Sequence, residues 1–177
     1  MTDYEIWNLI IRSLTMIIVG AGLFYTGYQI KLSRLFHRDN HDWNRRIESQ
    51  KALVHYNTTV MSTKLNEMFD FMNINKSIPL DKIMSEIEKS KETQNLIHRY
   101  LNIYEGYARG IIQGIYDEEL IKNARRGVMV KTYLRFKEYI EFRKQQWGPT
   151  AWKELESMAN KWNHESTNYK ERDKTGG

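Results

Sequence analysis

The residues of this chain that are best suited to chemistry are few. His37 and His41 are four residues apart, so a helix would place both on one face, where paired imidazoles can bind a metal ion. No pattern of nearby carboxylates completes such a site, and we expect no bound metal. Glu105 is a candidate acid or base, but the simpler interpretation is a buried carboxylate that is bonded to Asn102 or to an arginine. Because the chain has no cysteine, a thiolate metal site, a disulfide framework and a cysteine nucleophile are excluded.

Recognised catalytic motifs are also absent. The sequence contains no G-x-x-x-x-G-K, no G-x-S-x-G and no H-E-x-x-H. Arg34 and His41, with six residues between them, satisfy only the loosest form of the Arg-x4-6-His motif of all-α ribonucleases. Basic residues beside an apolar segment have a simpler role at a membrane surface. We therefore expect a protein that is not an enzyme and that carries no cofactor.

The composition is that of an ordinary globular chain with one unusual segment. Of the 177 residues, 27 are Lys or Arg and 22 are Asp or Glu, which gives a net charge of +5. The basic residues are spread among acids, so no stripe for nucleic acid emerges apart from a cluster next to the apolar segment. Only two prolines and ten glycines occur, which excludes collagen-like and Pro/Gly-rich disordered classes.

That segment, residues 13–30, has no charged residue and predicts a membrane span. A helix of this length reaches about 27 Å, close to the hydrocarbon thickness of a bilayer. Trp7 at one end and Tyr25 and Tyr28 at the other suit the two interfaces. A cleaved signal peptide fits poorly, because the leader is acidic and no small-residue cleavage site follows. A buried core helix is the remaining alternative to a transmembrane segment over residues 1–30.

The charges beside the span predict its orientation. Lys31, Arg34, Arg38, Arg45 and Arg46 follow the span, whereas only Arg12 precedes it. Under the positive-inside rule, the N-terminus is periplasmic and the C-terminal domain is cytoplasmic. We therefore expect a single-pass protein of the bacterial inner membrane.

Polar and small residues of the span fall on one face of the helix. At roughly 100° per residue, their spacings of four and three keep them in one stripe. This polar stripe consists of Asn8, Arg12, Thr15, Val19, Gly22, Thr26 and Gln29. A second line of small residues, Ser13, Gly20 and Gly27, repeats every seven positions on another face. Small residues let helices approach closely, and polar residues face a partner or water rather than lipid.

Two interpretations of these faces stay open. In the first, two helices form a dimer that packs through Gly22 and Thr26. In the second, parallel helices close into a ring, the polar stripe lines a central pore, and the small-residue line admits the neighbouring helix. Arg12 would then form a ring of positive charge near the outer mouth and favour anions.

The chain after the span is predicted to be helical throughout, so the fold class is all-α. Residues 31–72 read as one long juxtamembrane helix that continues from the span. In it Ile47, Val54, Met61 and Met68 recur at intervals of seven, which fits either a helix–helix wall in an oligomer or packing on the protein's own domain.

Residues 73–166 are expected to form a cytoplasmic helical domain, followed by a disordered tail at 167–177. A turn at 73–79 leads to a helix over 80–115, where Gly106, Gly110 and Gly114 share one face and predict a close helix crossing. Asp117 is predicted to cap a helix that ends by Gly127. A further helix runs to the break at residues 148–149, and residue 150 is expected to cap the last helix.

Several motifs in this domain resemble a known family. The runs are Leu101–Glu105, Ala108–Ile111 and Gly114–Leu120, with Asn102, Glu105 and Asp117 as characteristic positions, followed by Arg135–Ile140, Arg143 and Trp162. They resemble a bacterial family of small proteins of unknown function with one N-terminal span and a helical cytoplasmic domain. Within it, the length and the basic juxtamembrane helix are similar to the small membrane accessory proteins of type VI-B CRISPR systems, over roughly residues 10–165.

The resemblance implies a homo-oligomeric membrane pore that compromises the inner membrane once the RNA-guided CRISPR ribonuclease detects phage RNA. It implies as partners other copies of the chain, the lipid bilayer and, functionally, that ribonuclease. It also implies a diverged ribonuclease-type fold, although the tight Arg–His motif is missing. A membrane-tethered RNA-binding or ribonuclease-type domain is therefore the alternative function, and a plain membrane tether is a third.

Overall fold

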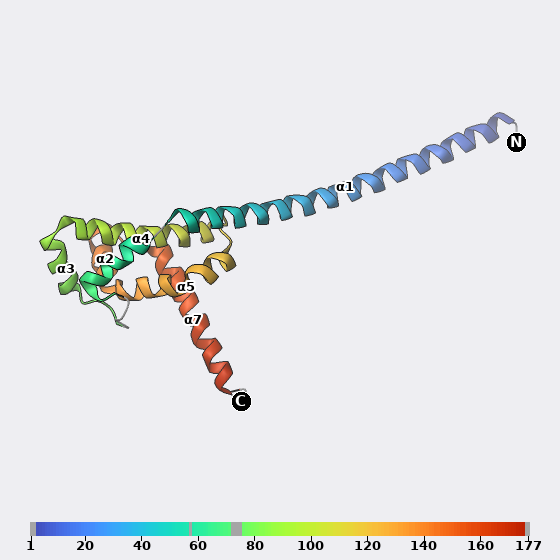
Figure 1. The fold of residues 1–177 in the computed structure, drawn as a ribbon. Coiled ribbons are helices and arrows are strands. Elements are labelled where there is room, and N and C mark those ends of the chain that lie inside the picture. Colours follow the sequence, from blue (N-terminus) through green and yellow to red (C-terminus); the bar gives the residue numbers. More distant parts are fainter. Residues whose placement is uncertain (1–2, 57, 72–75, 176–177) are drawn as a thin grey trace. The chain divides into compact units, whose positions relative to one another are not determined.

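The computed structural model describes residues 3–56, 58–71 and 76–175, and among these it contains helices and no strand. The all-α prediction is therefore confirmed (Figure 1). The helices are α1 (Asp3–His55), α2 (Thr59–Phe69), α3 (Leu80–Lys89), α4 (Lys91–Ile112), α5 (Glu118–Arg135), α6 (Lys137–Trp147) and α7 (Lys153–Thr175). The chain divides into two compact units, Met1–Asn44 and Arg45–Gly177.

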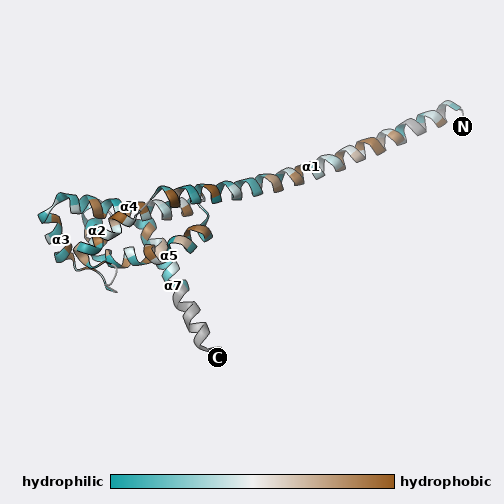
Figure 2. Ribbon diagram, in the orientation of Figure 1, coloured by the Kyte–Doolittle hydropathy of each residue, from teal (hydrophilic) through white to brown (hydrophobic). Residues whose placement is uncertain are grey.

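The first unit is the N-terminal part of α1, which runs without interruption from the apolar segment into the basic segment. Its apolar window has a mean hydropathy of 1.7, and none of that window is buried. Figure 2 shows hydrophobic residues recurring along this stretch. By length and composition, α1 is the one helix among the described residues that is suited to cross a membrane. Exposure of the whole window argues against the core-helix alternative.

The second unit is a helical bundle with an aromatic core. Helix α7 packs against both α4 and α5, and α3 packs against α4 and α6. Tyr100, Tyr104 and Trp162 are fully buried between these helices. Edge-to-face contacts join the rings, as between Tyr100 and Tyr104, whose centroids are 5.1 Å apart. The predicted burial of Trp152, Leu155, Ala159 and Trp162 is confirmed, although Trp152 lies in the turn before the last helix.

The long juxtamembrane helix ends earlier than the sequence predicts. Helix α1 stops at His55, and α2 begins at Thr59, so residues 31–72 are not one helix. The hydroxyl of Tyr107 donates to the carbonyl of Ala52 at 3.1 Å and caps the last turn of α1. The run Thr58–Val60 then offers β-branched residues with low helix propensity. The predicted boundary at residue 72 lies outside the described residues.

This break divides the predicted heptad between two helices. Val54 in α1 is 83% exposed, whereas Met61 and Met68 in α2 pack partly against the core of their own unit. Of the two interpretations of this seam, packing on the protein's own domain therefore fits Met61 and Met68.

The predicted helix over 80–115 is also two helices. Ser90 has an extended backbone and ends α3, and its hydroxyl accepts from the backbone N–H of Glu92 at 3.2 Å to cap α4. Serine favours such a cap because its side chain competes with the helix for backbone donors. Helix α4 then ends at Ile112 rather than at residue 115.

The three glycines at intervals of four do not form one packing face, so that prediction is wrong. Gly106 is exposed, and a Cβ there would meet nothing within 4 Å. Gly110 is buried beneath the ring of Tyr116. Gly114 lies beyond the helix with a φ of 71°, and the N–H groups of Ile115 and Tyr116 both donate to the carbonyl of Gly110. Gly114 thus ends α4 in the left-handed conformation that glycine permits.

The predicted helix boundaries after α4 are partly correct. Asp117 caps α5 as predicted, with its carboxylate accepting from the N–H of Leu120 at 2.9 Å. Helix α5 continues through Gly127 to Arg135, because the burial of Ile121 and Met129 on either side outweighs the cost of one glycine. The break at Gly148 is confirmed.

The last helix differs from its prediction at both ends. Helix α7 begins at Lys153, after a turn, so residue 150 is not its cap. Its backbone extends to Thr175, across residues that the sequence predicts as a disordered tail. The segment Glu165–Thr175 contains no proline or glycine and includes several Lys, Glu and Arg residues, which are good helix formers.

The glycines give a matched pair of stability predictions. A Cβ at Gly110 would overlap the ring of Tyr116, so Gly110→Ala must displace that ring and should lower the free energy of unfolding of the bundle by about 1–3 kcal/mol. Gly106→Ala meets no atom and should raise it by about 0.5–1 kcal/mol. Urea unfolding followed by circular dichroism measures both. Equal effects of the two substitutions would contradict this packing.

Candidate functional site

The residues of the polar stripe lie along the exposed surface of α1. Arg12, Thr15, Val19, Gly22, Thr26 and Gln29 are exposed, and Asn8 is half-buried. Among them, Thr26 and Gln29 have side chains that bond within the helix. The Thr26 hydroxyl donates to the carbonyl of Gly22 at 2.8 Å, and the Gln29 amide donates to the Tyr25 hydroxyl at 2.9 Å. These two residues therefore tolerate an apolar surrounding better than their type alone suggests.

The small-residue line of the span has open space around it in the described chain. Ser13, Gly20 and Gly27 are exposed, and a Cβ at Gly20 or Gly27 would meet no heavy atom within 4 Å. No other described part of this chain packs against Gly20 or Gly27, so the packing of this line against another helix stays a prediction.

The juxtamembrane residues with catalytic or metal-binding chemistry are spread along the outside of α1. Arg34, His37 and His41 are all exposed. Within the part of the chain that the structure describes, no three His, Asp or Glu side chains come together as a metal site. The structure therefore adds nothing to His37 and His41 that would complete a metal centre.

The motif residues Asn102 and Glu105 hold the start of α7 against α4. The Asn102 side-chain carbonyl accepts from the indole N–H of Trp152 at 2.8 Å. One oxygen of Glu105 accepts from the backbone N–H of Leu155 at 2.8 Å, and the other accepts from Arg109 at 3.3 Å. The expectation of a buried carboxylate bonded to an arginine is confirmed, whereas Asn102 bonds to Trp152 instead of Glu105. We call this group of contacts the α4–α7 clamp.

Burial dominates the electrostatics of the clamp. Only 6% of Glu105 is exposed, and this desolvation, together with a side-chain hydrogen bond to Glu154, raises the pKa of Glu105 to about 7. The N–H of Leu155 and the charge of Arg109 oppose that rise. Glu105 thus holds a proton at a pH where an ordinary carboxyl group has lost it. Its neighbours are structural, and among the described residues no metal ligand set accompanies it.

Asp117 is a second structural motif residue. Besides capping α5, its backbone N–H donates to the Ser49 hydroxyl at 2.7 Å, and that hydroxyl donates to the carbonyl of Arg45 at 2.8 Å. The Arg45 guanidinium donates in turn to the carbonyl of Tyr116 at 3.2 Å. These bonds fix the last turns of α1 to the α4–α5 connection.

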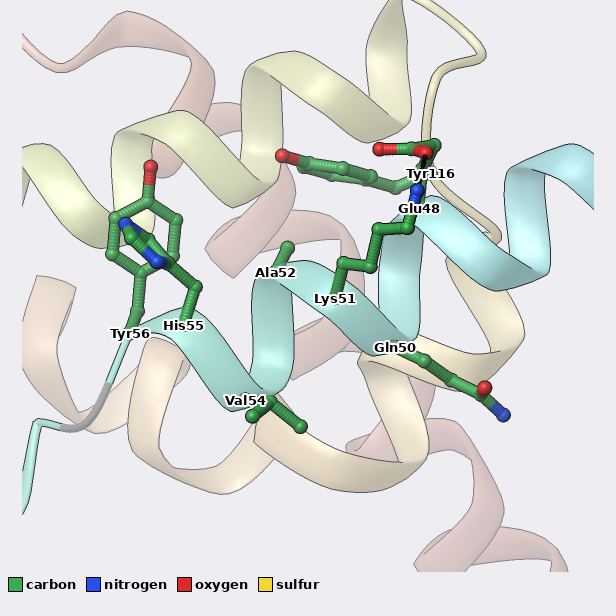
Figure 3. A pocket seen from close by; sticks show the side chains of 8 residues that line it. All are labelled: Glu48, Gln50, Lys51, Ala52, Val54, His55, Tyr56 and Tyr116. Atoms are coloured by element: carbon green, nitrogen blue, oxygen red, sulfur yellow. Dashed lines mark hydrogen bonds and ion pairs between the residues drawn. The ribbon is translucent and has the colours of Figure 1, made fainter.

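Two hollows flank the C-terminal end of α1. The first, of about 710 Å³, lies along α1 and is closed on one side by Tyr116 (Figure 3). Its lining is Glu48, Gln50, Lys51, Ala52, Val54, His55, Tyr56 and Tyr116. Within it Lys51 donates to Glu48 at 2.7 Å, so its two charged side chains neutralise each other.

The second hollow, of about 630 Å³, shares His55 and Tyr56 with the first and is more polar. Helix α4 contributes Asn95, His98, Arg99 and Asn102 to its lining. We call it the α4 hollow. The sequence did not predict this hollow, although the polar residues of α4 recur three and four positions apart, which indicates a polar helix face.

An aromatic group behind the α4 hollow fixes His98. Its Nε2 lies 2.7 Å from the Tyr139 hydroxyl, which accepts from Nε of Arg143 at 3.0 Å. The ring centroids of Trp147 and Trp152 lie 5.0 Å and 5.6 Å from that of His98. Burial, and then the charge of Arg143, lower the pKa of His98 to about 4, so the imidazole is neutral at physiological pH.

The protein is an all-α chain of two parts. One part is an apolar helix suited to cross a membrane, and the other is a bundle held by the α4–α7 clamp. Residues 16–162 match a protein family described as a domain of unknown function (DUF4760), and the chain belongs to that family. The match extends from the apolar segment to Trp162, so it includes Asn102, Glu105 and Asp117. Membership of a family of unknown function is thereby confirmed. No curated protein and no solved structure matches the chain.

The raised pKa of Glu105 predicts how the stability of the bundle depends on pH. Between the usual carboxyl pKa and about 7, the folded state holds a proton that the unfolded state has released, so stability should fall as the pH rises through that window. Glu105→Gln is neutral at every pH and should flatten this dependence. Thermal unfolding of the two proteins between about pH 5 and pH 8 compares the slopes.

Glu119→Gln is the matched control, because Glu119 is an exposed carboxylate at the start of α5. It should keep the slope of the unmodified protein. A Glu105→Gln variant with the same slope as both would show that Glu105 is ionised throughout and would contradict the proton assignment.

Proposed function

We propose that this protein is a single-span protein of the bacterial inner membrane that assembles into a homo-oligomeric pore. In this proposal the N-terminus is periplasmic and the bundle is cytoplasmic, in accord with the positive charges that follow the span. The observation that carries the proposal is the polar stripe of α1, which runs from Asn8 to Gln29 along the apolar segment of that helix.

Among the residues of the polar stripe, Arg12 and Asn8 give the strongest support for a pore. Thr26 and Gln29 satisfy polar atoms inside the helix, so a lipid environment is tolerable for them. Arg12 directly precedes the charge-free segment 13–30, and an arginine at this depth reaches the membrane interface or faces a water-filled cavity. A ring of identical chains would place one Arg12 per chain around a lumen, where the charges attract anions.

The line of Ser13, Gly20 and Gly27 supports a ring more than an isolated anchor. Each helix of a closed ring needs two different contact faces, because the patch that it offers differs from the patch that it receives. Open notches at Gly20 and Gly27 would admit an apolar face of the neighbouring helix.

The resemblance to small membrane accessory proteins of type VI-B CRISPR systems supports a role in antiviral defence. We propose that the pore enhances CRISPR antiphage defence by depolarising the inner membrane after the RNA-guided ribonuclease detects phage RNA. The alternative is a membrane-tethered RNA-binding or diverged ribonuclease-type domain that acts with that ribonuclease. Exposure of both Arg34 and His41 on α1 keeps these residues accessible to RNA.

Substitutions on the polar stripe should block conduction while assembly continues. Thr15→Leu and Thr26→Leu place apolar bulk in the proposed lumen, and a hydrophobic constriction closes by dewetting. In cells that carry the defence system, both variants should abolish phage-induced depolarisation, measured with a voltage-sensitive dye at matched protein levels. The purified variants should keep the high-order particle size of the unmodified protein in mild detergent.

Phe24→Leu is the matched control, because Phe24 is an exposed apolar residue on another face of the same helix. It should depolarise and assemble normally. If the span is only an anchor, all three variants should protect equally, because lipid accepts leucine more readily than threonine. Purified protein that cleaves RNA, and loses this with His41→Ala while its assembly is unchanged, would instead support the ribonuclease-type alternative.

A further inference from the structure

The α4 hollow has the donor set of an anion site. Of the described residues that line it, none is a carboxylate, and its polar side chains are a guanidinium, two imidazoles and two carboxamides beside the phenol of Tyr56. Arg99 is exposed, and no hydrogen bond or ion pair with another described residue engages its guanidinium. An arginine with no acidic partner at the edge of a concave site is suited to bind a phosphate or a carboxylate.

The bonds behind the hollow orient two further donors. Because an indole N–H can only donate, the Asn102 oxygen faces Trp152, and the amide NH2 of Asn102 remains to donate elsewhere. At Tyr139, the hydroxyl accepts from Arg143, so its own proton is available to His98 Nε2. The neutral His98 ring then carries its proton on Nδ1, as a donor.

The opposite side of the hollow is apolar and aromatic. Tyr56, 37% exposed, stands at the end of α1, and Met61 of α2 completes this side. The Tyr56 ring is held edge-on by Tyr107, with centroids 5.7 Å apart. A fixed and partly exposed ring is a stacking surface for a flat group.

We propose that the α4 hollow binds a single nucleotide, with its phosphate on Arg99, its base against Tyr56 and the base edge on the amides of Asn95 and Asn102. Carboxamides suit this role, because they pair with the donor–acceptor edge of a base. The volume of about 630 Å³ lies within the usual range of small-molecule sites, about 300–1,000 Å³. This site lies wholly in the bundle, so the proposal does not depend on whether the span forms a pore.

Calorimetric titration of the full chain in mild detergent tests the site. The probes are the four ribonucleoside 5′-monophosphates, the corresponding nucleosides and inorganic phosphate. At least one monophosphate should bind saturably, with one site per chain, and more tightly than its nucleoside or phosphate alone. Arg99→Met should weaken that binding by about 10- to 100-fold, as expected for the loss of a charged hydrogen bond.

Two variants make the test specific. Lys91→Met removes a positive charge from the exposed start of the same helix and should leave the affinity nearly unchanged. Asn102→Asp keeps an acceptor for the Trp152 indole but adds a negative charge to the hollow, so it should weaken monophosphate binding without unfolding the bundle.

Three results would overturn the proposal. The first is the absence of saturable binding by every monophosphate. The second is an equal loss of affinity in Arg99→Met and Lys91→Met, which would indicate diffuse charge attraction. The third is tighter binding of a single-stranded oligoribonucleotide than of any monophosphate, with the same loss in Arg99→Met, which would assign the hollow to RNA.

Discussion

Burial of one carboxyl group, that of Glu105, organises the helical bundle. A buried carboxyl group needs partners, and here they are the N–H of Leu155, the Arg109 guanidinium and Glu154. Because Leu155 lies in the first turn of α7, satisfying this group fixes where α7 begins. The cost of burial is reduced when the group holds a proton, which agrees with its raised pKa.

The clamp also sets the shape of the α4 hollow. Trp152 adopts a φ of 51°, a left-handed conformation that is unfavourable for a bulky residue, and its bond to Asn102 helps to hold it there. So placed, Trp152 packs beside His98, which lines the hollow, and beside Trp147. Helix α4 therefore carries structural contacts and the lining of a cavity on adjoining positions, which explains the density of polar and aromatic side chains along it.

Features encoded in neighbouring residues were predictable, and features made by distant residues were not. The apolar segment, the cap at Asp117 and the break at Gly148 follow from local composition and spacing. The bond from the Tyr107 hydroxyl to the carbonyl of Ala52, in the last turn of α1, joins residues that are 55 positions apart. Equal spacing of Gly106, Gly110 and Gly114 suggested one shared role. In the structure Gly106 is exposed, Gly110 lies beneath Tyr116 and Gly114 forms the turn after α4. The α4 hollow could be recognised only after the end of α1, α2 and α4 were brought together, because residues of all three line it.

The proposed pore would have a direct electrical consequence, because Arg12 would place fixed positive charge in a narrow lumen and attract anions. The most direct measurement is the reversal potential of the purified protein in a planar bilayer under a potassium chloride gradient. A pore lined by the polar stripe should show anion preference, Arg12→Lys should retain it, and Arg12→Glu should reverse it toward cations. Absence of conductance, or a reversal potential that Arg12→Glu leaves unchanged, would contradict the placement of the stripe in a pore.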